Sequence, residues 1–283
     1  MDPDFIRRVI IRGLFSDDAL LGQLVLKGGN ALHLVHKIGN RSSLDIDVSL
    51  EHDFADAKNS VERIFVSMRK RFAAEGLHMF DEDFEEQGGG AKDEKGRIWG
   101  GYQLTFKVIE LRRYEELGKD LSKAQIQSLP VGPSQERSFT VQISRFEYCA
   151  GKEEVEFDDF LVCVYTPAMI AFEKLRAICQ QMPEYPLRKN RTPRARDFYD
   201  ITVISLWEGI DFGSSKNHAL VKHIFEAKLV PLNLIAEIQV QREFHRQDWT
   251  QVQNAVPISL KEFDFYFDFV VKQAQLLKPL WEK

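Results

Sequence analysis

The stretch from Val25 to Leu50 constrains the fold of this chain more than any other part. Its first residues, VLKGGNAL, predict a short strand, a glycine turn and a helix that runs to about Lys37. A polar turn then leads to LDIDVSL, whose apolar and polar residues alternate as in a strand with one buried face. Two strands joined by a helix belong in a sheet, so we expect an α/β arrangement in this part of the chain.

The order of the other predicted elements indicates two domains. Strands dominate up to Tyr165, and the loop EEQGGGAKDEKGR joins two of them as a hairpin. Thr166 and Pro167 are typical of a helix start, and nearly every later segment has helical apolar spacing. We therefore predict an α+β fold, with a mixed sheet and flanking helices in residues 1–165 and a helical bundle in residues 166–283. The predicted helices cover residues 4–24, 56–75, 120–128, 167–181, 194–208, 216–227, 231–243 and those from about 258 onward, and the predicted strands cover 44–50, 77–84, 98–110, 139–145 and 161–165.

Composition excludes some classes of protein. The apolar runs of this 283-residue chain are too short to cross a bilayer, so no membrane partner is expected. The start, MDPDFIRRVI, lacks the basic segment and long apolar core of a signal peptide. The three cysteines, without metal-ligand spacing, fit a reducing compartment, and we expect a cytoplasmic protein.

The charge is unevenly distributed along the chain. The net charge of −5 argues against general binding of polynucleotides. The segment from Glu173 to Arg196, however, holds seven cationic and two anionic side chains, a net charge of +5. Such a cluster on an acidic protein indicates a specific anionic ligand, and a solvated loop rich in Lys and Arg is the alternative.

Two aspartates share one face of the strand LDIDVSL. Asp45 and Asp47 lie about 6–7 Å apart along a strand and point to the same side, because side chains alternate. Two carboxylates held this close repel each other unless a cation lies between them. Oxygen ligands of this kind suit Mg²⁺, which also binds substrate phosphates. The alternative is a solvent-facing strand with no ligand.

The glycine pair before this strand is a candidate phosphate-binding turn. Gly28 and Gly29 stand at a strand-to-helix turn, where the backbone can approach a ligand and N–H groups can bind an anion. A phosphate-binding turn beside a metal-binding strand is the arrangement that nucleotidyl transfer needs, because the metal neutralises the triphosphate during in-line attack.

A second group of candidate residues comes from the helical half. Lys174 lies on one predicted helix, and Asp197 and Asp200 lie three residues apart on the next, in line with apolar residues. Carboxylates on the apolar side of a helix need a partner, and Lys174 and the nearby arginines are the candidates. An ion-pair network that only joins two helices is the alternative.

Together these stretches resemble the AbiEii/AbiGii-type nucleotidyltransferase toxin family, related to the toxins of type IV toxin–antitoxin systems. The resemblance rests on KGGNAL, RSSLDIDVSL, TPAMIAFEKLRAI and RARDFYDI, which span roughly residues 24–207. It implies a nucleotidyltransferase-like sheet, an NTP substrate, Mg²⁺ or Mn²⁺ as cofactor, an RNA acceptor such as a tRNA end, and an antitoxin partner. It assigns catalysis to Asp45, Asp47, Lys174 and Asp197, metal binding to Asp45 and Asp47, and nucleotide binding to Lys27, Gly28, Gly29, Asn30, Arg41, Ser43, Arg196 and Asp200.

This sequence departs from the family pattern at two positions. Asn30 follows the glycine pair where the family usually has Ser or Thr, and its amide is predicted to reach a phosphate. Gln142 stands where enzymes of this fold commonly have a third carboxylate, and Asp197 or Glu147 is the candidate replacement. A catalytically silent nucleotide-binding module is therefore an alternative to the enzyme, and an interaction protein that works through its helical half is another.

We expect the two candidate groups to meet in one cleft, with Asp45 and Asp47 opposite Lys174 and Asp197. The pair His33 and His36 has metal-like spacing, but no third ligand is evident in the sequence, and we assign it no metal.

Overall fold

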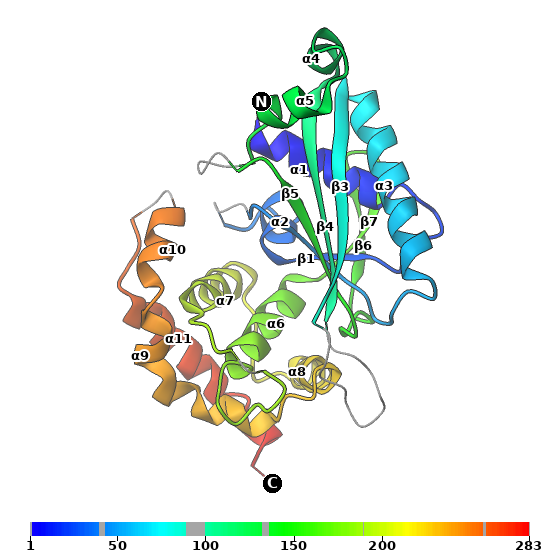
Figure 1. Cartoon of the computed structure of the whole chain (residues 1–283). Coiled ribbons are helices and arrows are strands. Elements are labelled where there is room, and N and C mark those ends of the chain that lie inside the picture. Colours follow the sequence, from blue (N-terminus) through cyan, green and yellow to red (C-terminus); the bar gives the residue numbers. More distant parts are fainter. Residues whose placement is uncertain are drawn as a thin grey trace. The chain divides into compact units, whose positions relative to one another are not determined.

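The computed structural model describes residues 2–39, 43–88, 100–131, 136–188, 190–256 and 259–282. The chain divides into two compact units. The first comprises Met1–Val35 and Ser42–Val164, and the second comprises His36–Arg41 and Tyr165–Lys283. The first unit holds the sheet, and the second is helical (Figure 1).

A mixed seven-stranded sheet organises the first unit, with strand order β3-β4-β5-β2-β1-β7-β6. The pairs β1/β7 and β2/β5 are parallel, and the other neighbours are antiparallel. The strands are β1 (Val25–Lys27), β2 (Ile46–Ser49), β3 (Leu77–Gln87), β4 (Gly101–Glu110), β5 (Phe139–Ser144), β6 (Glu153–Phe157) and β7 (Phe160–Val164).

The two faces of the central strands differ in polarity. Leu26, Val48 and Ile143 occupy paired positions and are buried, as the alternation in LDIDVSL predicts. Helices α1 (Pro3–Leu14) and α3 (Ala57–Ala74) pack against each other, and Phe72 of α3 contacts Phe106 of β4 on this apolar face. The polar side chains of β1, β2, β5 and β4 therefore lie on the opposite face.

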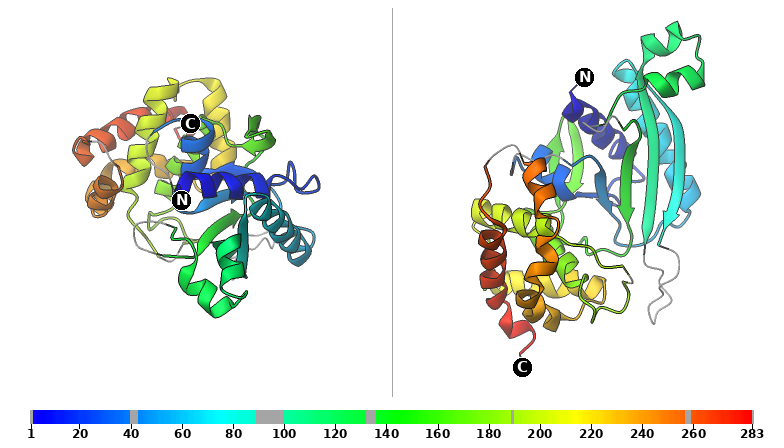
Figure 2. Two further views of the ribbon diagram at one scale, coloured as in Figure 1. Left: turned by 90° about the horizontal axis from the view of Figure 1, so that it is seen from above. Right: turned by 60° about the vertical axis from the view of Figure 1, so that its left-hand side comes forward.

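Two short helices lie at one end of the β3–β4 ribbon. They are α4 (Leu111–Glu116) and α5 (Leu121–Gln127), and Figures 1 and 2 show them at the end of these strands. Ala124 of α5 packs on Phe80 and Ile109, so this end has a small core of its own.

The second unit is built around α6 (Pro167–Cys179) and α7 (Ala195–Glu208). Thr166 caps α6 by accepting the N–H of Met169 at 3.2 Å, and Pro167 is in the first turn, which confirms the predicted helix start. Phe198 contacts Phe263 and Phe267, so these two aromatic residues of the last long helix are core residues. The remaining elements are α8 (Ser215–Ala227), η2 (Leu232–Gln241), α9 (Arg242–Arg246), α10 (Trp249–Ala255), α11 (Phe263–Gln275) and η3 (Lys278–Leu280).

Several predicted boundaries differ from the structure. The first helix ends at Leu14 rather than near residue 24, because the polar turn after Phe15 interrupts the helical hydrogen bonds. Leu44 is 41% exposed and precedes β2, so the predicted strand is shorter at its start. Strand β6 is absent from the predicted elements, and the segment Leu232–Gln241 is a 3-10 helix. No described helix has both the length and the apolar character that a membrane span requires.

Candidate nucleotidyltransferase site

The glycine turn lies directly against the predicted metal strand. β1 ends at Lys27, and Gly28 follows with φ +70°, in the left-handed region that favours glycine. A Cβ atom at Gly28 would lie 3.1 Å from Cβ of Asp47 and closer still to its carboxylate. Only glycine therefore lets the turn approach Asp47 this closely. After the turn the chain forms α2 (Gly28–Asn30) and the π-helical η1 (Ala31–Val35).

Strand pairing aligns a row of polar residues across the sheet. Lys27 pairs with Asp47 of β2, Asp47 pairs with Gln142 of β5, and Gln142 pairs with Gln103 of β4. Directly paired residues project from the same face, so these four side chains share the polar face. Asp47 is half-buried and Asp45, one residue before β2, is exposed, so solvent reaches both aspartates.

Gln142 is paired with Asp47, at the position where the resemblance predicts a third carboxylate. Its Nε2 donates a hydrogen bond to Oε1 of Gln103 at 3.0 Å. A neutral amide at this position cannot accept a proton as a base. Sequence reasoning missed Gln103, although the polar positions in GYQLTFKV place it on this face.

Lys27 is turned along the sheet toward a buried carboxylate. Its Nζ lies 3.5 Å from Oε1 of Glu147 and donates to Oγ of Ser144 at 3.3 Å. Lys27 and Glu147 are 7% and 5% exposed, so this is a buried ion pair. Glu147, one candidate for the missing third carboxylate, therefore acts as a counter-ion of Lys27. Sequence reasoning missed the pair because its members are 120 residues apart.

Asn30 reaches the segment that leads into β2. Its side chain is fully buried, and Nδ2 donates to the backbone oxygens of Asp45 at 2.7 Å and Ser43 at 3.3 Å. The predicted nucleotide-binding role of Ser43 stays a prediction, and its side chain is partly exposed. Arg41 lies outside the described residues.

In the second unit, Lys174 joins α6 to α7 through two carboxylates. Its Nζ lies 3.0 Å from Oδ1 of Asp197 and 2.8 Å from Oδ2 of Asp200, and all three side chains are buried. Burial alone would raise the pKa of Asp197, but Lys174 and the nearby arginines outweigh it and hold the pKa below its usual value. The predicted partnership of these residues is thus present, and Asp197 is placed to orient the lysine. Arg196 is exposed on the same helix.

The start of α7 is capped by residues about 50 positions later in the chain. The N–H of Arg194 donates to Nδ1 of His245 at 3.1 Å, and the N–H of Ala195 donates to Oδ1 of Asp248 at 3.0 Å. No side chain of the helix's own N-cap residue supplies a cap. The sequence HRQDWTQVQ resembles an ordinary polar helix–loop edge. Its capping role could not be predicted, because the capped helix lies about 50 residues earlier in the chain.

Some arginines of the basic segment form contacts within the second unit. Arg176 pairs with Glu173 at 2.9 Å, and Arg191 donates to the backbone oxygen of Gln181 and stacks on the ring of Phe244. Partial burial and neighbouring Arg194 lower the pKa of Arg188, as expected where cations crowd together. Arg176 and Arg191 thus have structural partners within the second unit.

The chemistry of the first unit's donor set fits a divalent cation. Asp45 and Asp47 offer carboxylate oxygens on a solvent-accessible segment, and Mg²⁺ prefers oxygen ligands together with bound water. Within the described ranges, no three or more His, Cys, Asp and Glu side chains form a metal-binding group. His33 contacts Asp4 at 3.0 Å and His36 contacts the backbone oxygen of Tyr165 at 2.8 Å, so these histidines have separate partners.

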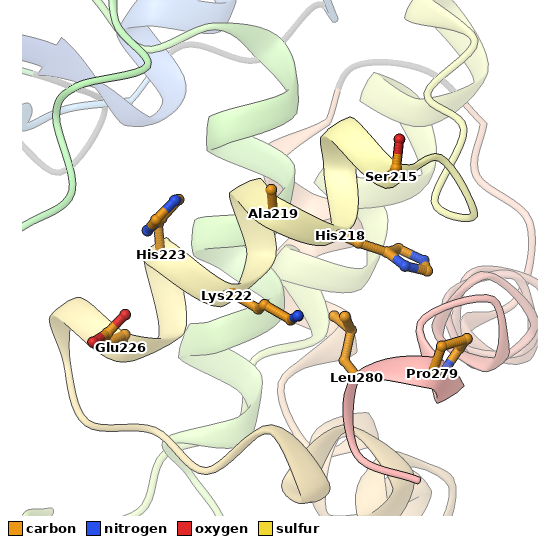
Figure 3. Close-up of a pocket in the computed structure, with 8 residues that line it drawn as sticks. All are labelled: Ser215, His218, Ala219, Lys222, His223, Glu226, Pro279 and Leu280. Atoms are coloured by element: carbon orange, nitrogen blue, oxygen red, sulfur yellow. The ribbon is translucent and has the colours of Figure 1, made fainter. Parts of the chain in front are cut away.

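A pocket in the second unit is formed by one face of α8 together with η3 (Figure 3). The ring of His218 lies near the end of α11, at 3.1 Å from the backbone oxygen of Leu276. None of the residues predicted for the site lines this pocket.

A comparison with protein families gives a match over most of the chain. The family described as nucleotidyl transferase AbiEii toxin, type IV toxin–antitoxin system, matches residues 9–269. A candidate nucleotidyltransferase from H. pylori has a similar crystal structure, with 16% identity, coverage of 98% of this chain and 94% of that one, and a TM-score of 0.46. An antigenic nucleotidyltransferase-like protein from Paracoccidioides brasiliensis shows 14% identity, coverage of 89% and 94%, and a TM-score of 0.40. No curated protein matches the sequence. The family match confirms the predicted resemblance: this protein belongs to the AbiEii family of nucleotidyltransferase toxins of type IV toxin–antitoxin systems.

Proposed function

We propose that this protein transfers a nucleotide from an NTP to a hydroxyl group of an RNA acceptor, a tRNA end in the first instance, with Mg²⁺ as cofactor. The observation that carries the proposal is the close approach of Gly28 to Asp47, because it joins the turn proposed to bind phosphate to the strand proposed to bind metal. Membership of the toxin family supports growth inhibition as the outcome and an antitoxin as the protein partner.

The proposed reaction is an in-line displacement at the α-phosphorus. The acceptor oxygen forms a bond to phosphorus, the bond to the bridging oxygen of the β-phosphate breaks, and pyrophosphate leaves. The hydroxyl proton passes to solvent, because Gln142 at the third position cannot accept it. In this proposal the N–H groups after Gly28 bind phosphate oxygens, and Asp45 and Asp47 hold the metal. When bound, Mg²⁺ neutralises phosphate charge and orients the triphosphate.

Lys174 is proposed to neutralise phosphate charge in the same reaction. Its two carboxylate partners, Asp197 and Asp200, hold the ammonium in one position, which lowers the entropy cost of binding an anion. Asp197 is thus better suited to orient Lys174 than to polarise a hydroxyl, because its Oδ1 already accepts a hydrogen bond from the lysine.

A catalytically silent nucleotide-binding module is the second candidate. Gln142 favours it, because the amide stands beside Asp47 and is already hydrogen-bonded to Gln103. Such a protein would bind an NTP through the glycine turn without transferring it.

Incubation of the purified protein with each α-labelled NTP, Mg²⁺ and total tRNA separates the two. We expect label to enter RNA with the wild type and to be lost in Asp47→Asn, which removes one charge at constant size. Asp83→Asn is the matched control, because Asp83 is an exposed carboxylate on β3.

Two outcomes contradict transferase activity at this site. NTP binding without label incorporation by the wild type would support the silent module. Equal incorporation by wild type and Asp47→Asn would show that the transferase activity does not use this strand.

A further inference from the structure

The fully buried amide of Asn30 connects the glycine turn to the aspartate pair. Nδ2 carries two hydrogens, and two backbone oxygens accept from it: that of Asp45 at 2.7 Å and that of Ser43 at 3.3 Å. Only the NH₂ end of the amide can donate to carbonyl oxygens, so the orientation of this side chain is determined by its contacts.

This orientation leaves no amide hydrogen for a phosphate. Both hydrogens are directed at carbonyls, and the remaining polar atom, Oδ1, is an acceptor that would repel a phosphate oxygen. Among the described residues, Oδ1 of Asn30 has no hydrogen-bond partner and is buried. A direct phosphate contact would require Asn30 to give up the bonds that it makes here.

The hydrogen bonds of Asn30 hold a part of the backbone that strand pairing does not hold. The register of β2 with its two neighbours covers residues from Ile46 onward, and Asp45 lies one residue before this strand. Asn30 therefore holds the backbone of Asp45 from outside the sheet, while Gly28 contacts Asp47 two residues later. The glycine turn and the two carboxylates are thus connected at two points.

We propose that Asn30 is a positioning residue for divalent-cation binding: it fixes the backbone of Asp45 so that the two carboxylates stay in register, and it does not bind phosphate. This inference rests on the proposed function, because it assumes that Asp45 and Asp47 hold the cation. Residues that orient metal ligands typically change metal affinity about 10- to 100-fold when they are replaced.

The test uses Mn²⁺ as the probe and separates metal binding from phosphate binding. Mn²⁺ affinity of the full-length protein is measured by electron paramagnetic resonance without nucleotide, and the affinity for a nonhydrolysable NTP analogue is measured in EDTA. We expect Asn30→Ala and Asn30→Ser to weaken Mn²⁺ binding at least about tenfold and to change metal-free nucleotide affinity less than about twofold. The serine variant restores the residue type usual in the family, and its shorter side chain does not span both carbonyls.

Ser49→Ala is the matched control, because Ser49 is also fully buried but lies at the far end of β2 from Asp45. It should keep wild-type Mn²⁺ affinity. Circular dichroism and thermal unfolding verify that each variant is folded, and Asn30→Ser provides the comparison if Asn30→Ala does not fold.

Asp47→Ala, measured in parallel, distinguishes failure of this inference from failure of the proposed function. If Asp47→Ala loses Mn²⁺ binding but both Asn30 variants keep it, the positioning role is refuted and the metal site stands. If the Asn30 variants lose metal-free nucleotide affinity instead, Asn30 is a phosphate ligand. If Asp47→Ala binds Mn²⁺ as the wild type does, the metal site and the positioning role are both refuted.

Discussion

Mild acid should destabilise the second unit through one buried histidine. His245 is fully buried, and its Nδ1 accepts the N–H of Arg194 at the start of α7. Burial, opposed by the nearby carboxylate of Asp197, lowers the pKa of His245 to about 4. A proton added to Nδ1 would face another N–H group, so protonation has to break this cap.

The direction and size of the effect follow from the two states of the histidine. The unfolded chain titrates near pH 6.5 and binds the proton in a range where the folded protein does not, so stability is complete above pH 6.5 and falls as the pH drops toward 4. The full difference corresponds to about 3 kcal/mol, and the part lost between pH 7.5 and 5 is about 2 kcal/mol.

Urea unfolding at pH 7.5, 6 and 5 measures this loss. Trp207, Trp249 and Trp281 lie in the second unit, so their fluorescence reports on its unfolding once the fourth tryptophan, Trp99, is replaced by Phe. In His245→Asn the amide oxygen takes the place of Nδ1 and does not titrate. This variant loses ring contacts with Phe198 and Phe244 at every pH, but its stability should depend about 2 kcal/mol less on pH over this range.

His223→Asn is the control, because His223 is exposed on α8. An imidazole NMR titration gives an independent readout, in which the His245 signal should not move above pH 5. Equal pH dependence of wild type and His245→Asn, or a His245 signal that titrates near pH 6.5, would refute the reasoning.

Three further variants test the two candidate groups. Gly28→Ala should lose Mn²⁺ and nucleotide binding, because the added Cβ would collide with Asp47. Gly76 has a similar positive φ with open space around it, so Gly76→Ala should cost only the backbone strain of about 1–2 kcal/mol. Equal effects of the two variants in urea unfolding and Mn²⁺ titration would contradict this. Lys174→Met should destabilise the folded protein by about 3–5 kcal/mol, because two buried carboxylates lose their cation. Replacing Asp197 and Asp200 by Asn in the same variant should recover stability in urea unfolding without recovering nucleotide transfer. Gln142→Glu should tighten Mn²⁺ binding about tenfold, because it adds a charged oxygen ligand beside the aspartate; unchanged affinity would show that Gln142 does not face the cation.

Local sequence patterns predicted most of the elements. The alternation in LDIDVSL placed Ile46 and Val48 in the core, and the Thr166–Pro167 cap marked the first residue of α6. These signals depend on residues within a few positions of one another, which is why they are visible without a structure. The 3-10 helix η2 and strand β6 were missed because their local patterns do not differ clearly from those of an α-helix or a loop.

The candidate site depends on local sequence patterns and also on contacts between residues that are distant in the chain. Gly28, Asp47 and Lys174 were predicted from residue type and spacing, and their roles stay predictions, whereas strand register shows that Gln142 lies beside Asp47. The meeting of the two groups in one cleft stays a prediction. The partners of Lys27, Asn30 and the start of α7 could not be predicted, because each contact joins residues that are distant in the chain.

By itself, the sequence determined on which face of a strand or helix the candidate residues lie, because side-chain direction follows from a repeat of about 2 or 3.6 residues. Only the tertiary structure decided which partners these residues contact. Strand register paired Asp47 with a neutral amide, Asn30 turned its amide to the backbone of Asp45, and a distant histidine capped α7. The reason is that buried polar groups must find partners, and chain packing determines which partners are in reach.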